Sequence, residues 1–200
     1  MIEDIFQNLN TVFFNFEWYE VYDFIEYVSS IYWNEEINQG FKHKVNEVLE
    51  EEMSGYRFVG EYIAPIIDEV EIKEIEEVFE SEYNGVKRHL SSALELLSDR
   101  ENPDYQNSIK ESITAVEAVA QKITGKKSDL ASCLKIMNLD LNNSFKNGLS
   151  QLYSWTNKED GIRHAHTGEE LRTSFHEAKF MLVSCSAMIN YLISKSKNVN

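Results

Sequence analysis

The sequence of 200 residues has only two cysteines and two prolines, and it contains no long apolar run. Cys133 and Cys185 fall at apolar positions of helical patterns, without the spacing of a zinc knuckle or a disulfide framework. We therefore expect buried free thiols in a cytoplasmic protein. A stretch of about 18 apolar residues is missing, and so is a basic-then-apolar segment before a small-residue cleavage site. These absences exclude a disulfide-stapled fold and predict a soluble protein with no membrane partner.

Basic residues are scarce in the N-terminal part of the chain. Residues 1–33 hold six acids and no Lys or Arg, and residues 1–82 hold 21 acids and four bases, a net charge of −17. Residues 83–200 hold 13 acids and 15 bases, a net charge of +2. Because phosphate contacts need Lys and Arg, a polyanion would meet the C-terminal part. A solvated acidic face is the alternative explanation for the N-terminal part.

The first 82 residues are predicted to form an acidic, aromatic-rich helical region with one β-hairpin. Helical spacing of apolar residues predicts helices over residues 17–33 and 35–53. Two short β segments, 56–59 and 62–64, flank a tight Gly-Glu turn and predict a hairpin that leans on helices. A short acidic helix is expected from Asp68 onward.

Residues 83–200 are predicted to form an antiparallel helical bundle, so the fold class is mainly α. Asn102 is the candidate N-cap of the bundle's second helix, and Gly125 is expected to end that helix. The last helix has an apolar stripe broad enough for both a core and a dimer partner. The apolar periodicity places the helices over residues 84–99, 103–124, 129–137, 142–156 and 169–195.

The polar segment 156–168 lies between two apolar periodic segments and carries the residues that we expect to do any chemistry. They are Asn157, Lys158, Asp160, Arg163, His164 and His166. On the preceding long helix, the candidates to orient this segment are Glu111, Ser112 and Glu117. At 100° per residue, Ser112 falls inside the apolar arc of that helix and Glu117 falls on its edge.

The polar segment is open to four interpretations. A zinc site needs three or four ligands, whereas His164 and His166 would face different sides of a helix. A Ser-His-Asp hydrolase lacks its nucleophile elbow here. Metal-free RNA cleavage needs a base, an acid and a cation for phosphate, which histidine, arginine and lysine supply. In the fourth, structural interpretation, the polar side chains form a turn and bond backbone carbonyls at the end of the bundle.

A family resemblance rests on several stretches of the sequence. Residues 103–117 read Pro-Asp-Tyr-Gln-Asn-Ser-Ile-Lys-Glu-Ser-Ile-Thr-Ala-Val-Glu, and residues 160–165 read Asp-Gly-Ile-Arg-His-Ala. Together with residues 54–59 and 90–100, they resemble AbiJ-type abortive-infection proteins over most of residues 20–190. The C-terminal part of those proteins is similar to the HEPN superfamily (higher eukaryotes and prokaryotes nucleotide-binding).

The resemblance implies a helical bundle that often dimerises, with many members acting as metal-independent endoribonucleases of toxin or anti-phage systems. It therefore implies RNA as substrate, a homodimer, and no cofactor or metal. The superfamily signature is an Arg followed by a His after four to six residues. Arg163 has no histidine at that distance, because residues 168–170 are Gly, Glu and Glu. The nearest equivalents are Lys158 and Asn157, which are separated from His164 by five and six intervening residues.

Two hypotheses follow from the sequence. The first is a HEPN-like ribonuclease with a rearranged Arg163-His164 site. Lys158 lacks the planar fork with which arginine binds phosphate in a bidentate manner. The second is a non-catalytic module in which catalysis is lost. Its acidic N-terminal half would bind a basic protein partner, or its fold would bind RNA without cutting it.

Overall fold

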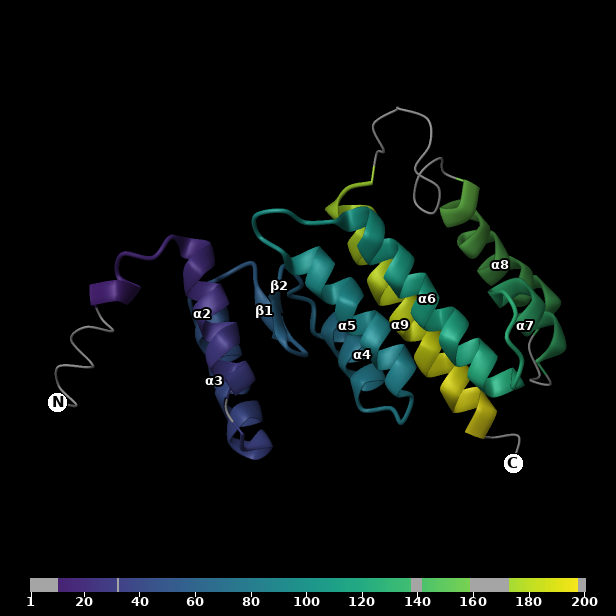
Figure 1. Ribbon diagram of the computed structural model, residues 1–200, viewed down its shortest axis with the longest axis horizontal. Coiled ribbons are helices and arrows are strands. Elements are labelled where there is room, and N and C mark those ends of the chain that lie inside the picture. Colours follow the sequence, from purple (N-terminus) through teal and green to yellow (C-terminus); the bar gives the residue numbers. More distant parts are fainter. Residues whose placement is uncertain (1–10, 32, 138–141, 159–172, 198–200) are drawn as a thin grey trace. The chain divides into compact units, whose positions relative to one another are not determined.

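The computed structural model describes residues 11–31, 33–137, 142–158 and 173–197, with only the backbone for residues 155–158. The described residues are mainly helical with a single two-stranded antiparallel hairpin, which confirms the predicted fold class (Figure 1). The chain divides into two compact units, Met1–Pro65 (unit 1) and Ile66–Asn200 (unit 2).

Within its described residues, unit 1 includes helices α2 and α3 and the predicted hairpin. Helix α2 spans Trp18–Ile31 and α3 spans Glu35–Glu51. Strands β1 (Arg57–Val59) and β2 (Tyr62–Ala64) pair antiparallel with Phe58 opposite Ile63. Gly60 begins the turn with φ of 58°, a conformation that favours glycine, so the hairpin is confirmed at the predicted place.

Side chains from the two helices close both edges of this hairpin. The Asn46 amide accepts a hydrogen bond from the Phe58 N–H (2.6 Å) and donates one to the Phe58 carbonyl (3.2 Å). On the other edge, the Glu26 carboxylate accepts from the Ile63 N–H at 2.5 Å. A two-stranded sheet is marginal alone, and these contacts attach it to α2 and α3.

The core of unit 1 lies between the hairpin and the helices. Leu49, Phe58 and Ile63 are buried and are surrounded by partly buried side chains: Tyr22, Ile25, Phe41, Val45 and Tyr56. Lys42 is also buried. Its ammonium lies 2.7 Å from a Glu61 carboxylate oxygen and donates to the Gly60 carbonyl at 3.1 Å. The charge is therefore compensated at the turn.

Unit 2 is a helical bundle in which α6 and α9 pack together at the centre (Figure 1). The Ser108 hydroxyl of α6 donates to the Ala93 carbonyl of α5. One turn later in α6, Glu111 contacts His89, one turn earlier in α5, so these two helices run antiparallel. The rings of Tyr105 and Phe175, which begin α6 and α9, lie 6.3 Å apart. Helices α6 and α9 are therefore parallel. The bounds of the helices are α4 Glu69–Phe79, α5 Asn84–Ser98, α6 Tyr105–Thr124, α7 Leu130–Ile136, α8 Asn143–Lys158 and α9 Phe175–Lys197.

Helix α8 runs antiparallel to α6 and α9. Near its start, the Phe145 ring lies 5.3 Å from the ring of Tyr191, close to the end of α9. One turn before its end, Tyr153 bonds Glu117 in the middle of α6. The end of α8 and the starts of α6 and α9 therefore lie at the same end of the bundle (Figure 1).

Two predicted helix starts were wrong. The N-cap of α6 is Asp104, whose carboxylate accepts from the Asn107 N–H at 2.9 Å, and not Asn102. Helix α9 begins at Phe175 and not at residue 169, because Ser174 caps it in a Ser-x-x-Glu capping box with Glu177. The end of α6 is confirmed at Gly125, which has φ of 67°.

The broad apolar stripe of α9 is used within the chain. Helix α9 packs against α4, α5 and α6, and its buried residues include Ala178, Leu182, Cys185, Ile189 and Leu192. Cys133 and Cys185 are buried free cysteines, as predicted. Throughout the described ranges, each helix is too short or too polar to cross a lipid bilayer.

Candidate functional site

The predicted loop residues lie largely outside the described part of the chain. Asp160, Arg163, His164 and His166 fall within residues 159–172, which the structure does not describe. Asn157 and Lys158 close α8, where only the backbone is described. The three predicted supporting residues on α6 are all described, and each has a different surrounding.

Glu117 connects α6 to α8. Its carboxylate accepts a short hydrogen bond from the Tyr153 hydroxyl, 36 residues further along the chain. Tyr153 precedes Asn157 by four residues, so both fall on one face of α8. The Glu117–Tyr153 contact therefore holds α8 one turn before the predicted polar segment begins.

Glu111 connects α6 to α5 instead. Its carboxylate lies 2.7 Å from Nδ1 of His89, and each side chain is 27% exposed. His89 is not among the predicted site residues, because its carboxylate partner lies 22 residues away in the sequence. No local spacing in the sequence signals the pair, because it forms only through the packing of α5 against α6. The pair fixes the orientation of the imidazole ring.

Ser112 has a structural contact. It is fully buried, and its hydroxyl donates to the Ser108 carbonyl one turn earlier at 2.9 Å. Ser112 does lie in the apolar arc, and Glu117 is half-buried on its edge, so both helical positions are confirmed.

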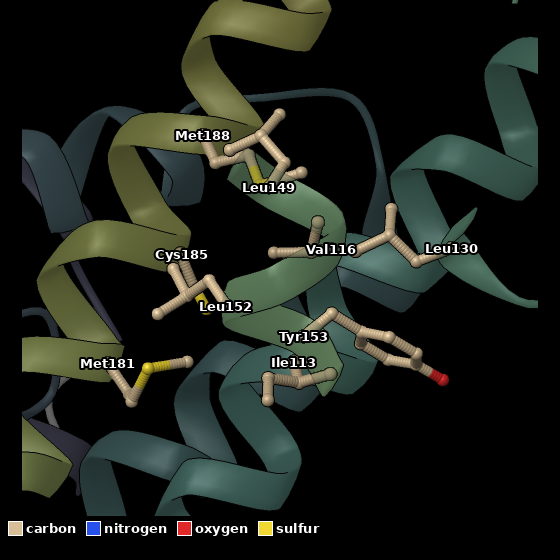
Figure 2. A pocket seen from close by; sticks show the side chains of 9 residues that line it. All are labelled: Ile113, Val116, Leu130, Leu149, Leu152, Tyr153, Met181, Cys185 and Met188. Carbon is tan, nitrogen blue, oxygen red and sulfur yellow. The ribbon is translucent and has the colours of Figure 1, made fainter. Parts of the chain in front are cut away.

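An apolar crevice separates part of α8 from the centre of the bundle (Figure 2). Its cavity volume is about 10 Å³, roughly room for one water molecule, whereas ligand pockets usually exceed about 300 Å³. Burial raises the pKa of the Cys185 thiol to about 12, so this group stays protonated at neutral pH. Figure 2 shows Tyr153 at the rim, with its ring directed away from Met181 and Cys185. The crevice is lined by Ile113, Val116, Leu130, Leu149, Leu152, Tyr153, Met181, Cys185 and Met188.

Two carboxylates of unit 2 are held at helix starts. Hydrogen bonds from the side chain and backbone of Ser174 lower the pKa of Glu177 at the start of α9. At the start of α7, the backbone N–H and hydroxyl of Ser132 lower the pKa of Asp129. Both are capping groups. Among the described residues, no three His, Cys, Asp or Glu side chains are grouped so that they could hold a metal ion.

Comparison with known proteins gave one finding. Residues 2–81 match the family model of AbiJ N-terminal domain 4. No curated protein and no solved structure matched the chain. The matched range covers unit 1 and continues through α4, and the resemblance to AbiJ is therefore confirmed on the N-terminal side. The HEPN-like C-terminal part lies outside the matched range. The match over residues 2–81 supports an AbiJ-type protein related to abortive infection.

Proposed function

We propose that the C-terminal part of this AbiJ-type chain is a HEPN-like module that cleaves RNA without a metal ion. The observation that carries the proposal is the arrangement of unit 2, in which α8 ends where α6 and α9 begin. The segment that joins α8 to α9 contains Arg163 and His164. Loops that connect helix ends do not have to contribute apolar side chains to the core, and catalytic and binding residues are often found in them.

In this proposal, His164 is the general acid and base. It takes the proton of the ribose 2′-hydroxyl while the 2′-oxygen attacks phosphorus, and a proton is returned to the departing 5′-oxygen. The products are a 2′,3′-cyclic phosphate and a 5′-hydroxyl. Arg163 and Lys158 stabilise the charge on the phosphorane, and Asn157 and His166 position the groups.

The supporting residues act at different distances from the chemistry. Glu117 holds α8 through Tyr153, one turn before Asn157. Asp160 lies within the polar segment itself and is proposed to orient the histidine side chains of that segment. Glu111 contributes through the α5–α6 contact with His89. The active form is proposed to be a homodimer in which two polar segments face one cleft.

The test is RNA degradation by the purified protein in excess EDTA. We expect cleavage to 2′,3′-cyclic phosphate ends, and we expect His164→Ala to abolish it without lowering the melting temperature. The matched control is His43→Ala, since His43 in unit 1 has a side chain that is 78% exposed. RNA left intact across several single-stranded and structured substrates would rule out the proposal.

A second function is favoured by the surface of unit 1. Phe14 is 84% exposed and Trp18 is 54% exposed, in a segment that has acidic residues and no Lys or Arg. An acidic, aromatic surface suits a basic protein partner, and the chain would then be a non-catalytic interaction module. Phe13 is less suitable as a probe because its ring packs against Phe16 and Phe24.

Co-purification of a basic protein tests this second function. A partner that is lost with Phe14→Ser, but retained with Phe180→Ser on α9, would support it. Phe180 is a suitable control because it is another exposed phenylalanine and lies in unit 2. A partner retained by both variants would contradict it.

A further inference from the structure

Lysines collect in two stretches of an otherwise acidic chain. From Ala118 to Lys158 the sequence has six lysines and only two acids, Asp129 and Asp140. From Ala178 to the last residue it has three lysines and no acid, although the whole chain has a net charge of −15. Two stretches that are far apart in the sequence thus share an excess of lysine over acidic residues.

The two stretches meet at one end of unit 2. Because α6 and α9 are parallel, their last turns lie together, and α8 begins beside them at Phe145 and Tyr191 (Figure 1). Helix α7 is attached there, since the Gln121 side chain of α6 donates to the Ser128 carbonyl at 3.0 Å. We call this surface the lysine end. It is formed by Lys122, Lys126, Lys127, Lys135, Lys146, Lys195 and Lys197.

These lysines lack carboxylate partners among the described residues. By contrast, Lys179 on the same helix α9 pairs with Glu71 of the acidic helix α4 at 2.6 Å. Asp129 is the acidic residue described beside α7, and its carboxylate is engaged by Ser132 at the start of α7. Glu80 and Glu82, in the turn between α4 and α5, lie at the same end of the bundle but on the side of α4 and α5, because α5 runs antiparallel to α6. Asp140 lies outside the described residues. The excess of positive charge at the lysine end therefore lies on the side of α6, α7 and α8.

Helix dipoles explain only part of this excess. A lysine in the last turn of a helix is favoured by the partial negative charge there, which accounts for Lys122 of α6 and for those closing α7 and α9. Lys126 and Lys127 lie beyond the end of α6. Lys146 lies one turn from the start of α8, where the dipole disfavours a cation. These three exposed or half-exposed lysines need another reason.

Two aromatic rings are exposed on the same surface. Phe145 is 43% exposed and Tyr191 is 36% exposed, and their rings are in edge contact at 62°. The Lys195 ammonium lies 6.0 Å from the centre of the Tyr191 ring. Exposed rings beside unpaired lysines are the two components with which proteins bind single-stranded nucleic acid, through base stacking and phosphate contacts.

We propose that the lysine end binds single-stranded nucleic acid. Lys126, Lys127 and Lys146 contact phosphates, and Phe145 and Tyr191 stack on bases. The lysine end is separate from the end of α8, since α6, with its 20 residues, spans about 30 Å between the two ends of the bundle. Binding here does not depend on cleavage, so its test is independent of the ribonuclease proposal.

The test is fluorescence anisotropy of the full chain with a labelled oligothymidylate of about 15 nucleotides, close to the upper site size of single-strand binding folds. DNA has no 2′-hydroxyl and is not consumed by the proposed cleavage chemistry. Replacing Lys126, Lys127 and Lys146 together by Gln should weaken binding at least tenfold at low salt. It should also reduce the magnitude of the slope of log affinity against log salt concentration by about two, because each of the three lost phosphate contacts contributes roughly 0.7 to that slope.

The matched control replaces three lysines elsewhere in unit 2 by Gln, which gives the same change in charge: Lys73, Lys87 and Lys110. This variant should keep at least half of the affinity. Phe145→Leu keeps an apolar residue but removes the stacking ring, and should weaken binding several-fold with an unchanged salt slope. His164→Ala should bind as tightly as the original chain, even if RNA cleavage is lost or never occurs.

Three results would overturn the proposal. The first is the absence of oligothymidylate binding at low salt. The second is an equal loss of affinity in the two triple variants, which would reduce the effect to net charge. The third is stronger binding to anionic lipid vesicles or to polyglutamate than to the oligonucleotide, which would assign the lysine end to a membrane or to an acidic protein.

Discussion

Unit 1 and unit 2 bury their apolar residues to very different extents. Among the described residues, unit 1 buries five hydrophobic side chains and leaves nine large ones exposed. Unit 2 buries 26 and leaves six large ones exposed within its described ranges. Unit 2 therefore has a core that can stabilise it by burial. Unit 1 depends more on hydrogen bonds that join its hairpin to its helices.

The largest expected effect is on the core of unit 2. Leu94 of α5 is fully buried, and Leu94→Ala should lower the free energy of unfolding by about 3 kcal/mol, because it leaves a cavity at the α5–α6 contact. Chemical denaturation measures the loss, and hydrogen exchange should locate it in α5, α6 and α9. Val70→Ala, at an exposed position of α4, should change stability by less than about 0.5 kcal/mol. Equal losses of unfolding free energy in Leu94→Ala and Val70→Ala would contradict the central position of Leu94 in the core.

The second prediction concerns the polar attachment of the hairpin in unit 1. Asn46→Ala removes both hydrogen bonds to Phe58, and we expect a loss of about 2 kcal/mol, because a buried N–H and carbonyl lose their partners. Hydrogen exchange should rise in β1 and β2, while α6 keeps its protection. Gln39→Ala, which removes an exposed side chain of α3, is the control. Uniform loss of protection in both units would show that their stabilities are coupled.

A smaller effect is expected for helix α8. Tyr153→Phe removes the hydrogen bond to Glu117 and should cost about 1 kcal/mol. Because α8 covers the crevice next to Cys185, alkylation of this thiol at pH 8 should become faster, although it is slow in the original chain owing to the raised pKa. Mass spectrometry of the Cys185 peptide measures the rate. Tyr191→Phe should leave the rate unchanged.

The smallest effect is a pH dependence at the start of α7. Hydrogen bonds from Ser132 lower the pKa of Asp129 below its ordinary value of 3.8. The stabilisation is therefore present above that ordinary value and is lost as the pH falls through the lower value of the folded state. An NMR titration of the Asp129 carboxyl group measures this pKa. In the wild-type chain, the protection of the α7 amides from hydrogen exchange should fall as the pH falls through this pKa, and in Asp129→Asn it should not. If Asp129→Asn lost amide protection over the same acidic range, the effect would belong to another group.

The sequence predicted the helices and the hairpin because each has a local signal. The Gly60-Glu61 turn between two β segments and the αL glycine at residue 125 depend on neighbouring residues alone. The start of α9 was missed although Ser174 and Glu177 form a capping box, because the apolar pattern upstream outweighed it. A residue-by-residue pattern also selected Asn102, yet Asp104 has the geometry that caps α6.

Site contacts between helices were harder to predict. His89 and Glu111 meet only because α5 and α6 pack antiparallel with a particular register, which periodicity does not determine. The lysine end has the same origin, since parallel packing of α6 and α9 brings together lysines that are about 70 residues apart in sequence. Arg163 and His164 lie outside the described residues, so the roles predicted for them stay predictions.

The closed hairpin of unit 1 has a consequence for how this protein behaves in a crowded cell. A strand edge with unpaired N–H and carbonyl groups is a template for other chains, and it leads to strand addition or aggregation. Here Asn46 occupies the outward groups of Phe58, and Glu26 occupies the outward N–H of Ile63. Two short strands are thereby insulated on both sides without a third strand. Strand addition to this hairpin is therefore hindered at Phe58 and at the Ile63 N–H, because these outward groups already have partners within unit 1.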